Sequence, residues 1–180
     1  DSAAAIIKDG EIIAAAQEER FSRKKHDSNF PKSAIQFCTT QAGIKIEDCK
    51  AIVYYEKPLL VFKRIFSNFI STAPRGSRSF MQAMKIWIGG KIYLKDVLKT
   101  ELALLYSISP SKVPEILFSK HHQSHAAAAF YPSPFEKAVI LCMDGVGEWA
   151  TTSTWIGNNN EIKPIWEITF PHSLGLLYSA

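Results

Sequence analysis

Cysteine is scarce in this chain of 180 residues, and long apolar runs are missing. The three cysteines, Cys38, Cys49 and Cys142, are an odd number without the close spacing of zinc ligands, which argues against a disulfide framework and a cysteine-based zinc site. This pattern favours a reducing compartment, with the cytoplasm as the default. No apolar stretch reaches the roughly 18 residues that would cross a bilayer, so a transmembrane role is not expected.

An initiating methionine, a basic leader and a signal-peptide profile are absent as well. The chain opens at Asp1, and strand-like sequence begins almost at once. Near the other end Ser173 is suited to cap the start of a helix, but the sequence stops soon after it. We therefore expect the chain to be a piece of a longer protein.

The composition is that of a folded domain, with 47% hydrophobic and 12% aromatic residues and a net charge of +4. The positive charge is concentrated between residues 57 and 100, where the only acidic residue is Asp96. The basic residues of this segment are Lys57, Lys63, Arg64, Arg75, Arg78, Lys85, Lys91, Lys95 and Lys99. They could face an anionic lipid or nucleic acid. Because they alternate with apolar positions and no nucleic-acid motif accompanies them, a solvated helical face is favoured and nucleic acid is disfavoured.

Periodicity and turn residues predict an alternation of strands and helices. Asp9-Gly10 between two apolar runs indicates a β-hairpin, Gly43 is suited to end a helix, and Gly89-Gly90 is expected to break another. The predicted elements are a hairpin over 3–17, a helix over 31–43, a strand over 51–55, helices over 59–70, 80–88 and 94–105, a strand over 115–119, a helix over 121–131, a strand over 138–143 and a hairpin over 150–170.

This order of elements predicts an α/β fold with a mixed sheet flanked by helices. It further suggests one complete three-layer unit and the start of a second copy, although no internal repeat is visible in the sequence. The expected division is a first subdomain over 1–136, with a helical insertion near 57–110, and a truncated second subdomain over 137–180.

Two histidines one helical turn apart are the sharpest chemical signal. His121 and His125 would project from the same face of the predicted helix and could converge on one ion, and Asp144 ends the next predicted strand. Two imidazoles and a carboxylate suit iron, manganese or zinc. The alternative is an ordinary polar cluster at the start of a helix.

Two further segments could meet an anion. The glycines of the turn Asp144-Gly145-Val146-Gly147 would let backbone N–H groups approach a phosphate, although the motif by itself favours an ordinary strand-connecting turn. The charged segment 18–27 contains Arg23, Lys24 and Lys25, which could neutralise a phosphate or carbamoyl-type anion or could simply lie on an exposed loop. No sequence typical of a serine nucleophile accompanies Ser22 or Ser124.

Taken together, four blocks of the sequence resemble the amino-terminal domain of the nodulation-type O-carbamoyltransferases, the family that includes cephalosporin and aminoglycoside carbamoyltransferases. The blocks occur in the same order as in that family. They are DSAAAIIKDGEIIAAAQEERFSRKKHDSNFP, HHQSHAAAAFYPSPF, MDGVGEWATT and SLGLLYSA.

The resemblance implies an actin-like fold of the acetate and sugar kinase and heat-shock superfamily, as a ribonuclease H-like half plus the start of a second half. It implies ATP as a substrate and a divalent metal, with iron favoured, held by His121, His125 and Asp144. Such enzymes transfer the carbamoyl group of carbamoyl phosphate, through a carbamoyl-adenylate, to a hydroxyl of a small-molecule acceptor.

Other residues acquire expected roles by the same resemblance. Lys25 is placed near carbamoyl phosphate as a catalytic residue, and Gly145 and Gly147 are placed against the nucleotide. His122 is expected to orient a ligand or to meet substrate. The resemblance leaves open whether the protein forms a homo-oligomer.

The chain also departs from the family pattern, in which the first strand ends in a His-Asp pair; here the sequence starts at the aspartate. We therefore expect activity of the intact protein and not of this piece. A non-catalytic nucleotide-binding or scaffold domain of the same fold is the main alternative, and a basic module for membrane surfaces or nucleic acid is the third.

Overall fold

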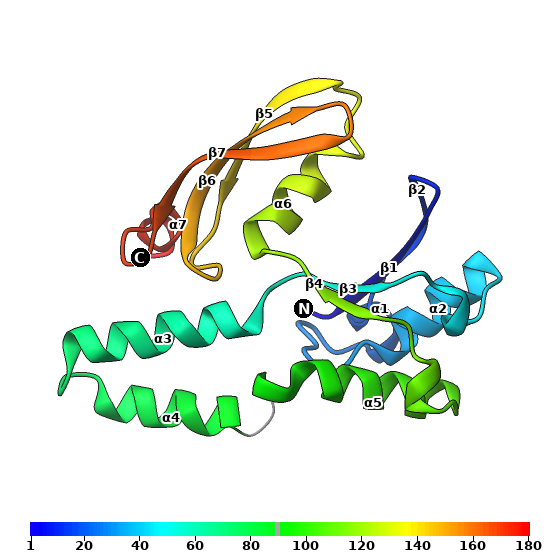
Figure 1. Ribbon diagram of the computed structural model, residues 1–180, viewed down its shortest axis with the longest axis horizontal. Coiled ribbons are helices and arrows are strands. Elements are labelled where there is room, and N and C mark those ends of the chain that lie inside the picture. Colours follow the sequence, from blue (N-terminus) through cyan, green and yellow to red (C-terminus); the bar gives the residue numbers. More distant parts are fainter. Residues whose placement is uncertain (89–90) are drawn as a thin grey trace. The chain divides into compact units, whose positions relative to one another are not determined.

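The computed structural model describes residues 1–88 and 91–180 (Figure 1). The chain forms two compact units: unit 1 comprises Asp1–Ile52 and Lys95–Ile116, and unit 2 comprises Val53–Leu94 and Leu117–Ala180. Helices and strands alternate in both, so the predicted mixed α/β class is confirmed. The predicted division near residue 136 stays a prediction.

Unit 1 begins with the predicted hairpin. Strands β1 (Ala3–Lys8) and β2 (Glu11–Gln17) are antiparallel. Between them Asp9 and Gly10 have φ values of 53° and 88°. This left-handed backbone is accessible to glycine and tolerated by aspartate, which is why the pair forms a tight turn.

Helix α2 (Lys32–Ala42) packs on this hairpin, with Ala34 and Cys38 buried. It ends where Gly43 takes a left-handed conformation, as the sequence predicted. A second cluster of buried apolar residues joins η1 (Ile46–Asp48) and helix α5 (Leu94–Tyr106) to the segment around η3 (Pro110–Lys112). Its buried members are Ile46, Leu102, Ala103 and Val113.

The charged segment 18–27 differs from the exposed loop that the sequence suggested. Its first part is the short helix α1 (Glu19–Ser22). Glu18 is buried, and its carboxylate accepts hydrogen bonds from the backbone N–H groups of Ser33 (3.1 Å) and Ala34 (2.8 Å), at the start of α2. Carboxylates are favoured at helix N-termini, where N–H groups lack partners within the helix.

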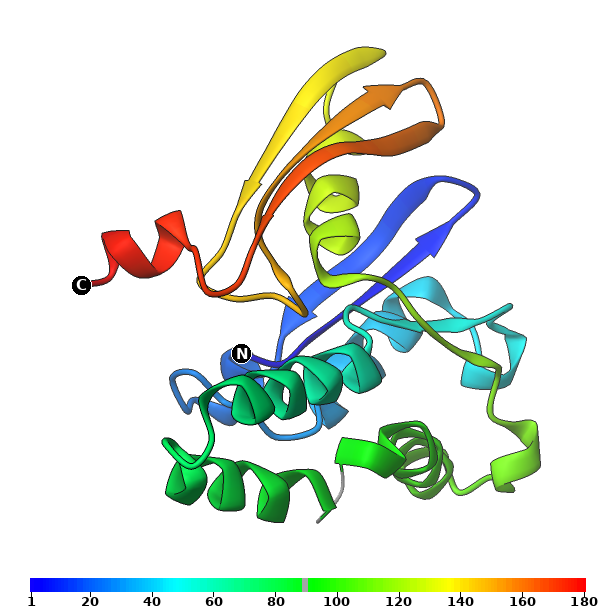
Figure 2. The same cartoon turned by 60° about the vertical axis from the view of Figure 1, so that its left-hand side comes forward.

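Unit 2 contains a three-stranded antiparallel sheet in the order β5 (Lys137–Met143), β6 (Ala150–Asn158), β7 (Glu161–Thr169). Helix α6 (His121–Phe130) packs against it, and both views show the helix beside the sheet (Figures 1 and 2). The buried core between helix and sheet consists of Ala126, Phe130, Ile140, Cys142 and Trp155.

Two antiparallel helices, α3 (Pro58–Thr72) and α4 (Ser77–Ile88), form the helical insertion. Their contact includes a stacked pair, Phe69 and Phe80, with ring centroids 4.0 Å apart. The predicted Gly89-Gly90 break lies outside the described residues, and η2 (Lys91–Tyr93) follows it. Most of the basic side chains described between residues 57 and 100 are exposed, whereas Lys57, Arg64 and Lys99 are half-buried.

The remaining strands, β3 (Ile52–Tyr54) and β4 (Ile116–Phe118), pair with each other. The short helix α7 (Leu174–Tyr178) starts at the predicted cap, where the Ser173 hydroxyl accepts from the N–H of Leu176 at 3.0 Å. The strands of the described ranges lie in three separate sheets, and the actin-like arrangement stays a prediction. None of the helices described there is long and apolar enough to cross a bilayer.

Candidate metal centre

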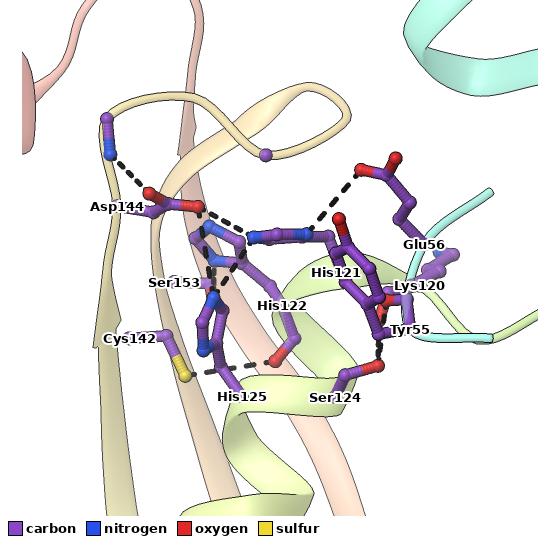
Figure 3. Close-up of polar contacts among 12 residues, drawn as sticks. Tyr55, Glu56, Lys120, His121, His122, Ser124, His125, Cys142, Asp144 and Ser153 are labelled. Carbon is purple, nitrogen blue, oxygen red and sulfur yellow. Dashed lines mark hydrogen bonds and ion pairs between the residues drawn. The ribbon is translucent and has the colours of Figure 1, made fainter. Parts of the chain in front are cut away.

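Three side chains of unit 2 converge where α6 begins and β5 ends (Figure 3). His121 is the first residue of α6 and His125 follows one turn later, so both imidazoles lie on the same face of the helix. Asp144 follows directly after β5, and its backbone N–H donates to Thr151 O across the strand pair. The helix and the strand end that the sequence predicted therefore bring these three residues together.

The ligand atoms of His121, His125 and Asp144 all lie within 4.8 Å of one another. His121 Nε2 is 2.7 Å from Asp144 Oδ2 and 3.0 Å from His125 Nε2. The third separation, between His125 Nε2 and Asp144 Oδ2, is 3.8 Å. We call these three residues the His–His–Asp cluster.

This cluster fits a divalent transition-metal ion. With metal–ligand bonds of about 2.0–2.2 Å, two ligands on one ion lie about 2.9–3.6 Å apart in octahedral or tetrahedral geometry. The three separations bracket that range, so side-chain adjustments of a few tenths of an ångström would suffice. Two nitrogen donors and one oxygen suit iron, manganese or zinc. Ion binding itself stays a prediction.

Local contacts orient the ligands. Asp144 Oδ1 accepts from the backbone N–H of Gly145 at 2.6 Å, which leaves Oδ2 facing the imidazoles. The Tyr55 ring lies edge-on to the His121 ring, with centroids 5.6 Å apart. Burial lowers the pKa of His125, the positive potential of His121 lowers it further, and the Asp144 carboxylate opposes both effects. A neutral imidazole is the form that binds a metal.

His122 faces the sheet. Its side chain is buried, and Nδ1 lies 2.6 Å from Ser153 Oγ, which also accepts from Trp155 Nε1 at 2.7 Å. Burial and the neighbouring His121 lower the pKa of His122. This contact fixes α6 on the sheet. The predicted role of His122 toward a ligand stays a prediction.

The turn after β5 passes close to the histidines. A Cβ atom on Gly147 would lie 3.1 Å from the Cδ2 atoms of both His121 and His122, so a larger residue would press on the two rings. At Gly145 the same atom would make only an ordinary contact at 3.6 Å. Gly147 is therefore needed for the close approach of turn and helix, and a nucleotide phosphate at this turn stays a prediction.

The helical insertion holds this turn from a second side. The Arg64 guanidinium donates to Gly147 O, and the backbone N–H of Lys57 donates to Glu148 Oε1. Arg64 also lies over the Phe170 ring, 5.8 Å from its centroid. Burial lowers the pKa of Arg64. The side chain remains positively charged, because guanidinium groups stay protonated in proteins.

Lys25, the predicted catalytic residue, is exposed on unit 1, as are Arg23 and Lys24. The acidic residues of the same segment serve the local fold: Asp27 Oδ1 accepts from the backbone N–H of Asn29, and Glu19 accepts from that of His26. The basic side chains therefore point to solvent while the acidic ones are engaged. The role of Lys25 toward carbamoyl phosphate stays a prediction.

Sequence reasoning missed Glu56, and it considered Arg64 only as one of the basic residues of segment 57–100. Glu56 follows β3, and its Oε2 lies 3.8 Å from His121 Nδ1. A carboxylate placed directly after a predicted strand was the signal that identified Asp144, and it applies to Glu56 as well. Arg64 carried no such signal, because its partner is a backbone carbonyl far away in the sequence.

The structure defines a class of protein: a mixed α/β domain with a His–His–Asp cluster at the point where one helix starts and one strand ends. The chain belongs to the carbamoyltransferase amino-terminal family, whose model "Carbamoyltransferase N-terminus" matches residues 1–180. The predicted family resemblance is thereby confirmed.

Curated relatives agree with this membership. The chain is 58% identical over 180 residues to "Uncharacterized protein sll1178" of Synechocystis and 37% identical to "Nodulation protein NolNO" of Sinorhizobium fredii. A more distant relative, "Uncharacterized protein MJ1051" of Methanocaldococcus jannaschii, is 23% identical. The alignments include 100%, 99% and 100% of this chain, but only 29%, 24% and 27% of the relatives. The chain thus spans less than a third of their length.

Proposed function

We propose that this chain is the amino-terminal part of an O-carbamoyltransferase that uses ATP and carbamoyl phosphate and carbamoylates a hydroxyl of a small-molecule acceptor. The observation that carries the proposal is the convergence of His121, His125 and Asp144 in a domain of the carbamoyltransferase amino-terminal family. An actin-like fold that clamps a nucleotide belongs to the same proposal.

The proposed reaction has two halves. Water first cleaves carbamoyl phosphate into carbamate and inorganic phosphate. A carbamate oxygen then attacks the α-phosphorus of ATP, so that a carbamoyl-adenylate forms and pyrophosphate leaves. The acceptor hydroxyl then attacks the carbamoyl carbon, AMP leaves, and the hydroxyl proton passes to a base.

The residues of the His–His–Asp cluster would hold a divalent metal, for which iron is the first candidate and manganese and zinc are the others. When bound, such an ion supplies positive charge that offsets phosphate oxygens. Asp144 would keep one oxygen on the Gly145 N–H while the other binds. The backbone around Gly145 and Gly147 would approach the nucleotide, and Lys25 would neutralise carbamoyl phosphate.

The decisive assay is pyrophosphate release by the intact protein. We expect pyrophosphate release to require both ATP and carbamoyl phosphate. The His121→Ala and Asp144→Ala variants should lose both the bound metal and the pyrophosphate release. Lys25→Ala should raise the KM for carbamoyl phosphate and leave the metal content unchanged. Intact, metal-loaded protein that binds ATP but releases no pyrophosphate would overturn the proposal and favour the non-catalytic nucleotide-binding domain.

A further inference from the structure

Glu56 occupies the side of His121 that faces away from the other two residues of the His–His–Asp cluster. Asp144 and His125 lie on the Nε2 side of the His121 ring, and Glu56 lies on the Nδ1 side, so the imidazole stands between two carboxylates (Figure 3). The side chain of His121 is only 15% exposed and that of Glu56 is 21% exposed. The pair is therefore largely shielded from water.

The chemistry of metal binding determines where the proton of His121 must be. A neutral imidazole carries one N–H, and a nitrogen that binds a metal must offer its lone pair. Because Nε2 is the atom that converges with His125 and Asp144, the metal-binding tautomer of His121 has its proton on Nδ1. Metal loading thus creates a buried N–H donor on the Glu56 side.

Among the described residues, none forms a hydrogen bond with Nδ1 of His121. His121 Nδ1 is buried and unpaired, and Glu56 Oε2 faces it at 3.8 Å. A buried donor without an acceptor costs about 1–3 kcal/mol. A shift of roughly 1 Å by the Glu56 carboxylate would bring Oε2 within normal hydrogen-bond distance of Nδ1.

The backbone on both sides of Glu56 is tied to the same site. Ser124 Oγ donates to Tyr55 O at 2.9 Å, which fixes the preceding residue to α6. The N–H of Lys57 donates to Glu148 Oε1, which fixes the following residue to the turn after β5. Glu56 is therefore held between the two elements that carry the metal ligands.

We infer that Glu56 is a positioning residue that accepts a hydrogen bond from Nδ1–H of His121 and so holds this ligand in its metal-binding tautomer and orientation. The inference rests on the proposed function, because it requires an ion at the His–His–Asp cluster. Such carboxylate–histidine–metal arrangements typically contribute 10- to 100-fold in metal affinity. Glu56 itself lies on the Nδ1 side of the His121 ring, opposite Nε2, so it is not a ligand of the same ion.

Metal affinity of the intact protein tests this inference without an activity assay. Metal-free protein is titrated with Co²⁺ in competition with a chromophoric chelator, and the visible absorption of bound Co²⁺ reports the ligand geometry. We expect Glu56→Ala to weaken Co²⁺ binding by about 10- to 100-fold and to change the spectrum. Glu56→Gln should recover most of the affinity, because its amide oxygen can also accept from Nδ1–H.

Glu136→Ala is the matched control. This glutamate belongs to the same unit, precedes β5 and is exposed, so its removal should leave Co²⁺ affinity and spectrum unchanged. Circular dichroism and thermal unfolding of the metal-free variants separate a folding defect from a binding defect. Because Glu56→Gln keeps the shape of the side chain, it remains informative if Glu56→Ala folds poorly.

Two different failures are distinguishable. If the parent protein binds Co²⁺ at the His–His–Asp cluster and Glu56→Ala binds it with the same affinity and spectrum, the role of Glu56 is wrong and the metal site stands. If the parent does not bind Co²⁺, or binds it undiminished after His121→Ala and His125→Ala, the metal site itself is wrong and the role of Glu56 falls with it.

Discussion

Among the described residues, two clusters of histidine and carboxylate groups occur, and they differ in how far their side chains are buried and supported. The His–His–Asp cluster belongs to unit 2. The other, which we call the amino-terminal cluster, consists of Asp1, Glu19 and His26 in unit 1. In both clusters the potential ligand atoms lie within 4.8 Å of one another. Convergence of ligand atoms therefore does not distinguish them.

Support from neighbouring residues does distinguish them. In the amino-terminal cluster His26 and Asp1 form a pair at 3.0 Å with side chains that are 69% and 46% exposed. In each cluster one carboxylate accepts from a backbone N–H, Glu19 from His26 and Asp144 from Gly145. Only in the His–His–Asp cluster is the central histidine mostly buried, with a further carboxylate, Glu56, facing the outer nitrogen of its ring. Metal sites depend on such outer contacts, so of these two clusters the His–His–Asp cluster is the one that we propose as the metal site.

The largest expected effect is the loss of metal from only one cluster. Asp144→Ala removes the oxygen ligand and should lower metal affinity by more than the roughly 100-fold upper range of outer-residue variants. His26→Asn should leave metal content unchanged, and asparagine suits the positive φ of 56° at this position. Elemental analysis and Co²⁺ titration of both intact variants measure the difference. Equal losses would contradict the distinction between the clusters.

A smaller effect is expected when the turn over the histidines is crowded. Gly147→Ala places a Cβ 3.1 Å from both the His121 and His122 rings, whereas Gly145→Ala makes an ordinary contact at 3.6 Å. Overpacking costs about 1–3 kcal/mol, so Gly147→Ala should lower the free energy of unfolding by that amount and weaken Co²⁺ binding. Urea denaturation measures it, with Gly145→Ala as control. If both variants have the same free energy of unfolding and the same Co²⁺ affinity, the turn accommodates the added methyl group without strain.

The contact from the helical insertion is expected to contribute less. Arg64→Ala leaves the Gly147 carbonyl without its guanidinium donor, and a half-buried unpaired group of this kind should cost about 1 kcal/mol. Lys63→Ala removes an exposed neighbour on the same helix and should change stability by less than about 0.5 kcal/mol. Urea denaturation of the two variants under the same conditions tests this. Identical midpoints would show that α3 does not hold the turn.

Local signals explain why most elements could be predicted from the sequence. Asp9-Gly10 specifies its turn, Gly43 ends a helix and Ser173 begins one, each through backbone conformation or capping within a few residues. The grouping of His121, His125 and Asp144 was predictable for the same reason, because it needs only a helical period and one neighbouring strand.

The parts that sequence reasoning missed depend on contacts between distant segments. The helix α1 was interpreted as a loop because the burial of Glu18 depends on the start of α2, which no local pattern reveals. Glu56 follows a predicted strand, but nothing in that local signal links it to His121, which lies 65 positions further along the chain. Arg64 finds its partner across a similar separation, 83 positions. Such pairings come from the tertiary structure and have no periodicity to detect.

The smallest expected effect concerns the core beneath the His–His–Asp cluster. Burial raises the pKa of Cys142, against an opposing hydrogen bond with Ser153, and burial together with the Asp48 charge raises that of Cys49. A thiol with a raised pKa favours the folded state at low pH. Its contribution is complete below the unfolded-state pKa of about 8.5 and is lost as pH rises further.

Stability of the intact protein should therefore fall above about pH 8.5, and Cys142→Ala should flatten part of that dependence. Alkylation mapped by mass spectrometry sharpens the comparison between the units: Cys142, only 6% exposed, should react more slowly than the half-buried Cys49 of unit 1. Unfolding in urea should make the two rates equal. If Cys142 reacts as fast as Cys49 in the native protein, α6 does not close over the sheet, and the better support assigned to the His–His–Asp cluster loses its structural basis.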